Sequence, residues 1–400
     1  MSTMSETKGD DAEEVESWNT EDALELERPP DLAAYDIVVA ARDWTVETMV
    51  QQIRQGNIDL DPAFQRRNAW RDARRSRLIE SFILGFPVPQ IVLAENPRKK
   101  KSYVVIDGKQ RLMTIAGFYL PEFRDYWTLP RFTGLEILSK MNRMDIDKFL
   151  IQEEFAQLRL QLSNADIRTT VLSGFREEGV LYDIFYRINT GSVPLSSQEL
   201  RQVLNRGDFA KYLLEVTSTE NELWKLLNIT SPDARLRDVE LLLRLIAWIQ
   251  FSRIYQGNMK LFLDDTMKNL NDDWKKQRTH ISAIANEVFL AVGAVREIFG
   301  EHAGRKFKNG RFERRLNRAL FEVQAFFFIS PSIRERAVPR KKSLVLAFKN
   351  LSKDAAFLSS IESTTKSIEN TSTRFESYRR LLQRVLKVKI ASPELGGENE

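Results

Sequence analysis

The chain has 400 residues, enough for two or three domains, which excludes a small scaffold held together by disulfides. Hydrophobic residues make up 42% of it and charged residues 29%, so the composition excludes a wholly disordered chain. It contains no cysteine, which excludes thiolate zinc sites, iron–sulfur clusters and cysteine nucleophiles, and fits a cytoplasmic protein. The longest apolar stretch, residues 239–251, is interrupted by Glu240 and Arg244, and we therefore expect no membrane contact.

The net charge of +4 conceals a strong asymmetry along the chain. Residues 1–36 carry 12 Asp and Glu against 2 Lys and Arg. Residues 66–111 carry 12 basic against 4 acidic residues, and residues 305–349 carry 13 against 3. Because a positive local potential attracts a polyanion, these two basic segments are the predicted DNA contacts. Solvated helix faces remain the alternative explanation, since basic segments carry no sequence code of their own.

The N-terminal part is predicted to combine helices with a β-hairpin. Residues 1–36 have the composition of an acidic, flexible tail. Apolar residues at helical spacing predict helices over residues 45–55 and 72–84. The β-rich runs 91–94 and 102–106 flank a polar turn and predict two antiparallel strands.

Beyond the hairpin the pattern becomes mainly helical. Asp107-Gly108 ends the second strand, and helical spacing resumes over residues 109–118. The alternating run 158–162 predicts a further strand. After residue 191 helices are expected to the end of the chain, and the strongest segments are 196–215, 236–255, 279–299, 311–329 and 373–388.

These elements predict an α+β fold divided into two domains. The first, residues 37–195, would contain the small sheet and the strand-to-helix turn. The second, residues 196–390, would be mostly helical. The tail over residues 1–36 and the last residues, 391–400, are expected to be flexible.

The segment from Asp107 to Arg111 is the most informative point of the sequence for chemistry. The first N–H groups of a helix lack intrahelical partners and lie at the positive end of the helix dipole, so a phosphate is stabilised there. Gly108 permits a close approach, while Lys109 and Arg111 add charge-assisted donors. Asp107 would hold a Mg²⁺ ion or orient the neighbouring arginine.

Further motifs surround this turn in a fixed order. They are Gln65-Arg66, the run Leu78-Ile79-Glu80-Ser81, the turn Pro87-Val88-Pro89 and, later, Phe185-Tyr186-Arg187-Ile188-Asn189-Thr190-Gly191 followed by Gln198-Glu199-Leu200-Arg201. Together they resemble the ParB/sulfiredoxin-like domain found at the front of GmrSD-type restriction proteins. That family's box reads Asp-Gly-Gln-Gln-Arg, whereas this chain reads Asp-Gly-Lys-Gln-Arg.

The resemblance implies a domain that binds and hydrolyses nucleotides in prokaryotic defence against foreign DNA. It implies an NTP with Mg²⁺ as the cofactor. The residues that match the motifs are Asp107, Gln110 and Arg111 as catalytic residues, with Asp107 on the metal, and Gln65, Arg66, Gly108, Lys109, Arg187 and Asn189 as nucleotide contacts. Glu199 matches the second signature, where it lines the same cleft or simply begins a helix. Because Lys109 replaces the family's glutamine, turnover is more in doubt than binding.

Two other functions remain open. Relatives that cut DNA carry a His-Asn-His centre, but this chain has only His280 and His302, so cleavage would need a partner nuclease or another defence subunit. Asp107-x-Lys109 also matches the acid-x-Lys element of Mg²⁺-dependent nucleases. The other alternative is a non-catalytic DNA-binding or scaffold subunit in which the nucleotide box is degenerate. An oligomer is compatible with each of them.

Overall fold

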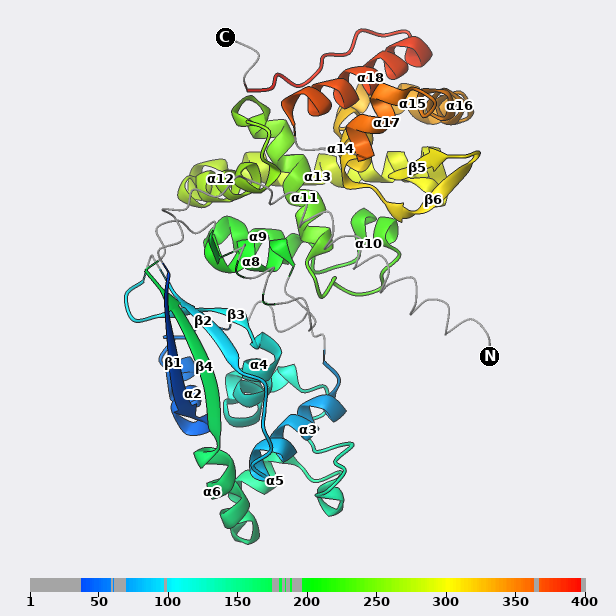
Figure 1. The fold of residues 1–400 in the computed structure, drawn as a ribbon. Coiled ribbons are helices and arrows are strands. Elements are labelled where there is room, and N and C mark those ends of the chain that lie inside the picture. The colour runs from blue at the N-terminus through cyan, green and yellow to red at the C-terminus, as the bar shows by residue number, and fades with distance from the viewer. Residues whose placement is uncertain are drawn as a thin grey trace. The chain divides into compact units, whose positions relative to one another are not determined.

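The computed structural model describes two compact units, which divide after Leu204 and are treated separately below (Figure 1). The described residues are 37–58, 60, 70–96, 99–174, 180–181, 184, 188, 196–362 and 367–396. The first unit contains a mixed sheet with helices, and the second is mostly helical. The predicted α+β class, with a small sheet followed by a helical region, is therefore confirmed.

The sheet of the first unit has four strands in the order β1-β4-β2-β3. They are β1 (Val38–Thr45), β4 (Asp166–Ser173), β2 (Ile91–Glu95) and β3 (Tyr103–Asp107). β4 runs antiparallel to β1 and parallel to β2, and β2 runs antiparallel to β3. Leu93 thus lies opposite Val105 on one side and Val171 on the other. The hairpin predicted from the β-branched runs is confirmed.

Helices cover the face of this sheet that carries Ile91, Leu93, Val105 and Ile167, and together they form the hydrophobic core of the unit. They are α2 (Val46–Arg54), α3 (Asp72–Ile83), α4 (Lys109–Tyr119), α5 (Ile146–Ile151) and α6 (Ala156–Asn164), and α8 (Ser197–Leu204) packs against β3. Short 3₁₀ turns lie at Pro121–Tyr126, Ser139–Met141 and Glu153–Phe155. The predicted helices over 45–55, 72–84 and 109–118 are confirmed.

The strand predicted over residues 158–162 is wrong, because these residues lie inside helix α6. The leucines at 158, 160 and 162 fit a strand period, but Leu158 and Leu162 are also four residues apart and so share a helix face. Leu162 is buried, whereas Leu160 is 54% exposed. The strand of this region is β4, which begins just after α6. Strand β1 was not predicted from the sequence.

Helix α3 carries a stripe of polar side chains that holds the loop over residues 128–138. Asp72 accepts hydrogen bonds from the N–H groups of residues 128 and 129, at 3.1 and 2.9 Å. Ser76 accepts one from Thr133 at 3.0 Å. Glu80 accepts three, from residues 136, 137 and 138, at 3.3, 2.9 and 2.7 Å. The four-residue spacing of these acceptors places them on one helix face, so the helix supplies the loop with the partners that a sheet would otherwise provide.

The second unit consists of helices and one hairpin. The helices are α9 (Asp208–Val216), α10 (Glu222–Leu227), α11 (Arg237–Phe251), α12 (Met259–Asp272), α13 (Trp274–Phe299), α14 (Arg318–Phe327), α15 (Pro331–Ala337), α16 (Lys341–Leu351), α17 (Ala355–Glu362) and α18 (Ile368–Leu386). Short 3₁₀ turns lie at Ser252–Ile254, Gly300–His302 and Val338–Arg340. No described helix is long and apolar enough to cross a bilayer.

The helix predicted over residues 311–329 is wrong in its first part. Residues Arg311–Leu316 form strand β6, which pairs antiparallel with β5 (Arg305–Lys308). The turn between them contains Asn309 and Gly310, whose φ angles are +53° and +81°. Two successive positive φ angles are the requirement of the tightest hairpin turns, and Asn-Gly meets it best. The helix begins only afterwards, where the Asn317 side chain accepts from the N–H of Leu320.

A network of charged side chains joins α11 to α14 inside the second unit. Glu240 accepts from Arg244 at 2.7 Å and from Arg318 at 2.8 Å. Glu322 accepts from Arg244 at 2.6 Å and from the Trp248 indole at 2.9 Å. All of these side chains are buried. Because an unpaired buried charge is strongly unfavourable, the network requires α11 and α14 to pack in one register.

Replacing Glu80 with alanine is expected to destabilise the first unit by about 3 kcal/mol, because three backbone N–H groups lose a charged acceptor. Native-state hydrogen exchange of peptides from α3 and residues 128–138 would measure the loss. Glu136→Ala on the same loop is the matched control. Its carboxylate forms an exposed ion pair with Arg77 at 2.9 Å, so the effect should stay below about 1 kcal/mol. Equal effects of the two variants would contradict the structural role given to Glu80.

Candidate functional site

A sharp turn joins β3 to α4 at Gly108, the residue that precedes the first turn of the helix. Gly108 has a φ angle of +94°, which disfavours any residue with a Cβ atom. A Cβ atom there would lie 2.9 Å from Ile91 Cγ1, and 3.1 and 3.3 Å from Arg111 Nη2 and Nε. Both the backbone conformation and the surrounding side chains therefore require glycine at this position.

The Arg111 side chain folds back over this turn. Its Nη2 donates to Asp107 Oδ2 at 2.8 Å and to the backbone carbonyl of Gln90 at 2.9 Å. The Gln90 side chain in turn accepts from Thr170 Oγ1 at 3.1 Å. Arg111 thus connects the end of β3 with the residue before β2. Its Nε is buried and has no hydrogen-bond partner among the described residues, so one donor at the turn remains unused.

Helix α4 begins without a capping side chain, since Gly108 has none to offer. The first N–H groups of an α-helix have no partners within the helix itself. Lys109 follows directly and is half-buried. The Asp107 carboxylate, 22% exposed, bonds to Arg111 through one of its two oxygens. The turn consequently combines backbone donors, a cation and a carboxylate within one short segment.

The side chain of Gln110 is held by an aromatic residue that the sequence did not single out. The Tyr126 hydroxyl donates to Gln110 Oε1, and the guanidinium of the buried Arg75 lies 4.2 Å from the centre of the Tyr126 ring. Burial raises the pKa of Tyr126 to about 12, despite the opposing effect of Arg75. The hydroxyl therefore stays protonated at neutral pH and acts as a donor. Arg75 itself bonds to Asp72 and to the Trp70 carbonyl.

The other residues predicted for the site cannot be placed beside the turn. Gln65, Arg66, Arg187 and Asn189 lie outside the described residues. Glu199 is described and buried, and its carboxylate accepts from the N–H of Ser196 at 2.7 Å while Ser196 Oγ accepts from the N–H of Glu199 at 3.1 Å. This reciprocal pair is a capping box at the start of α8. Glu199 thus shows the helix-start role that the sequence left open.

The metal chemistry open to the turn is restricted. Within the described part of the chain, no three His, Asp or Glu side chains come together. Asp107 is the acidic residue at the turn, and it shares its carboxylate with Arg111. Mg²⁺ is commonly held by one or two carboxylates together with substrate phosphates. A single carboxylate therefore fits a metal that arrives with a nucleotide better than a site built from protein ligands.

Many of the basic residues counted in the two predicted DNA segments have internal partners. In the first segment, Arg77 pairs with Glu136 and Lys99 donates to the Gly56 carbonyl. In the second, Lys308 pairs with Glu362. The basic side chains of this segment that are exposed on the hairpin strand β6 and around α15 and α16 are Arg311, Arg314, Arg315, Arg336, Arg340, Lys341 and Lys342. Charge count alone therefore overstates the surface available to DNA.

Replacing Gly108 with alanine is expected to destabilise the sheet of the first unit. Gly85→Ala is the matched control, because Gly85 also has a positive φ, +70°, but a Cβ there meets nothing within 4 Å. The control should lose about 1–2 kcal/mol from backbone strain alone, and Gly108→Ala at least about 1 kcal/mol more from the clash with Ile91. Hydrogen exchange of the β2 and β3 amides measures both, and equal losses would contradict the proposed packing.

One comparison with known proteins matches this unit. Residues 46–204 match the family model described as "GmrSD restriction endonuclease, N-terminal domain". The match begins at α2, ends at α8 and includes the whole of the Gly108 turn. No curated protein and no solved structure matches the chain.

Proposed function

We propose that this chain, whose residues 46–204 match the GmrSD N-terminal domain family, is a prokaryotic defence protein in which an NTP bound at the Gly108 turn controls engagement of DNA. The family match supports the coarser part, a restriction-related protein. The nucleotide-binding part of the proposal rests on the turn itself, where helix α4 starts without a capping side chain, next to Lys109 and the Asp107 carboxylate.

The nucleotide phosphates would lie at the start of α4, beside Gly108. The N–H groups of the first turn of α4 would donate to them, and Lys109 would add a positive charge. The unused Nε of Arg111 marks a buried donor at the same place. Arg111 therefore holds the turn in shape, through Asp107 and Gln90, as well as adding positive charge next to the phosphates.

The free oxygen of Asp107 would hold Mg²⁺ that arrives with the nucleotide. Mg²⁺ in such a position neutralises the phosphate charge and orients the leaving group. Asp107-x-Lys109 as a nuclease element has less support, because the carboxylate is already bonded to Arg111. A nuclease would also need further metal ligands, and the described residues bring none to the turn.

Hydrolysis is the weaker part of the proposal. Gln110 would have to orient a water molecule, but its amide oxygen accepts from Tyr126. Lys109 also stands where the family's box has glutamine. These two observations favour the second candidate, a subunit that binds the nucleotide and DNA but turns the nucleotide over slowly and leaves cleavage to a partner chain.

Nucleotide binding is tested with ATP, GTP, CTP and UTP, each with Mg²⁺, by thermal shift and calorimetry on the full chain. At about 100 times Kd, a ligand adds roughly 2.7 kcal/mol to native-state stability. Lys109→Ala should weaken the affinity about tenfold or more through loss of a charge-assisted contact. Lys101→Ala, an exposed lysine at the turn between β2 and β3, is the control. No binding of any nucleotide to the unaltered chain would refute the proposal.

DNA binding is proposed to use the exposed basic residues around α16. Lys341 and Lys342 are exposed and form no ion pair among the described residues. Because cations that contact phosphates release counterions, affinity should fall steeply with salt and depend little on base sequence.

The double variant Lys341→Gln and Lys342→Gln should lower the slope of log K against log salt by about 2, about one for each phosphate contact. Fluorescence anisotropy of a labelled duplex over a salt series measures this slope. Lys211→Gln, at an exposed lysine that pairs with Asp208 at 3.6 Å, should leave it unchanged. A flat salt response of the unaltered chain would argue against this surface.

A further inference from the structure

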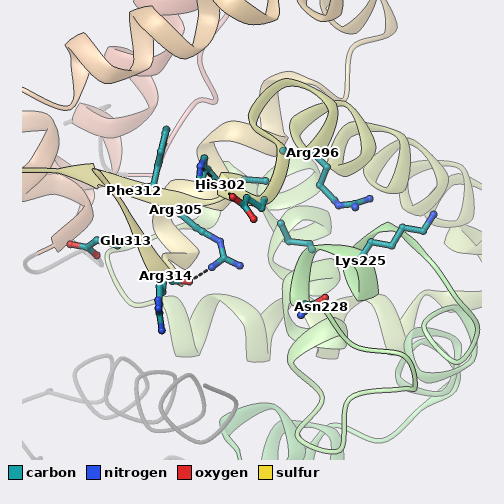
Figure 2. Close-up of a pocket in the computed structure, with 12 residues that line it drawn as sticks. Lys225, Asn228, Arg296, His302, Arg305, Phe312, Glu313 and Arg314 are labelled. Atoms are coloured by element: carbon teal, nitrogen blue, oxygen red, sulfur yellow. Dashed lines mark hydrogen bonds and ion pairs between the residues drawn. The ribbon is translucent and has the colours of Figure 1, made fainter. Parts of the chain in front are cut away.

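The second unit contains a pocket that no part of the proposed function uses. It lies between the β5–β6 hairpin, the turn Gly300–His302 after α13, and the end of α10 (Figure 2). Its volume is about 600 Å³, within the range of small-molecule sites, about 300–1,000 Å³. The side chains that matter for its chemistry are Lys225, Arg296, His302, Arg305, Phe312 and Arg314.

The lining has an excess of positive charge. Its four lysine and arginine side chains face two carboxylates, Glu301 and Glu313. Glu313 is bonded to Lys306 at 3.1 Å, a lysine outside the lining. The Glu301 side chain is 87% exposed and so largely in solvent. These two lining acids therefore do little to neutralise Arg305.

One wall of the pocket is held by a shared carboxylate. Glu222 accepts from Lys225 at 2.7 Å and from Arg296 at 2.6 Å. Burial would raise the pKa of Glu222, but the hydrogen bonds from Lys225 and Arg296 outweigh it and lower that pKa. The hydrogen bond between Lys225 and Glu222 also raises the pKa of Lys225. Lys225 also pairs with the exposed Glu220 at 3.8 Å, so two cations meet two anions and this wall adds no excess positive charge.

Lys225 and Arg296 also have a structural explanation. They lie near the C-terminal ends of α10 and α13, where a cation complements the negative end of the helix dipole. That explanation does not extend to Arg305 and Arg314, which belong to the hairpin. The hairpin cations therefore carry the functional argument.

Arg305 is the best placed of these cations. Its Nη1 donates to the backbone carbonyl of Arg314, which fixes the guanidinium, and Figure 2 shows that group in the space between the hairpin and α10. In the described part of the chain it has no carboxylate partner, and its Nε is buried without a hydrogen bond. A fixed guanidinium plane with donors to spare suits the oxygens of a phosphate group.

An aromatic surface lies next to these cations. The ring of His302 stacks on Phe312, with centroids 4.2 Å apart and planes inclined by 9°. The His302 side chain is 41% exposed, so part of the ring is accessible to a further planar group. Stacking of a base on such a ring is sequence-tolerant and adds to the phosphate contact.

We infer that this pocket binds a nucleotide-type ligand, with a 5′-phosphate on Arg305 and Arg314 and a base stacked on His302. Two sources have this chemistry, a free mononucleotide and the 5′-end of a DNA strand. The site is separate from the Gly108 turn and does not depend on the function proposed for it.

The test measures binding of dAMP, ribose 5-phosphate, and a short DNA strand with and without a 5′-phosphate, to the full chain by calorimetry. Arg305→Gln and Arg314→Gln should each weaken dAMP binding about tenfold or more, the effect of one lost charge-assisted hydrogen bond. Arg314→Gln keeps the backbone carbonyl that holds Arg305. A loss of affinity in this variant therefore reports the Arg314 guanidinium and not a displaced Arg305. Circular dichroism checks that both variants are folded.

Two controls separate the pocket from other sites. Arg315 follows Arg314 on β6 and so points to the opposite face of the hairpin, and Arg315→Gln makes the same charge change there. Arg111→Ala perturbs the Gly108 turn of the first unit and so reports any dAMP that binds there. Arg315→Gln should leave dAMP affinity unchanged. Tighter binding of the phosphorylated DNA strand than of dAMP would identify a DNA end as the ligand.

Three results would overturn the inference. They are the absence of saturable binding by all four probes, an equal loss in Arg315→Gln, and a loss confined to Arg111→Ala, which would assign the binding to the first unit. Equal affinity for ribose 5-phosphate and dAMP would show that the base adds nothing to binding and does not stack on His302.

Discussion

The contact between Arg111 and its two partners, Asp107 and the Gln90 carbonyl, determines the geometry on which the rest of the first unit depends. It joins the end of β3 to the start of β2, and both strands lie in the sheet that covers the core. Because the guanidinium passes so close to Gly108, a Cβ atom there would meet it at 3.1 Å. The glycine is required by its φ angle of +94° and by the Ile91 side chain as well as by this contact, and because glycine has no side chain the helix begins uncapped.

The two units satisfy their buried polar groups in different ways. In the first unit, acidic and hydroxyl side chains of helix α3 accept hydrogen bonds from the N–H groups of a loop, and Glu80 alone accepts three such bonds. In the second unit, buried carboxylates pair with arginines, as Glu240 does with Arg244 and Arg318. Neither arrangement leaves those carboxylates available for catalysis. The polar residues that remain for function are consequently the ones at turns and on the hairpin.

The sequence predicted the elements whose signals are local. The helix beginning at residue 109 and the hairpin of β2 and β3 follow from glycine, β-branched residues and apolar spacing. Predictions failed where two periods fit the same residues, as in the leucines of α6, and where basic residues hid the alternation of β6. For the candidate site, the sequence located the turn and the box residues. It could not indicate that Tyr126, sixteen residues beyond Gln110, bonds to that side chain, or that Gln90 holds Arg111, because such contacts depend on how separate segments pack.

The bond between Tyr126 and Gln110 bears directly on whether this turn only binds a nucleotide or also turns it over. With its pKa near 12, the phenol remains a donor, and its bond to the Gln110 amide oxygen occupies one of the two lone pairs with which that oxygen could orient a water molecule. Arg75 lies over the Tyr126 ring and is itself bonded to Asp72, a residue of the α3 stripe that holds the loop. Freeing Gln110 therefore means disturbing contacts that also stabilise the loop. For the proposed nucleotide site, this arrangement favours slow turnover, which suits a protein that signals the bound state to a partner rather than one that consumes nucleotide rapidly.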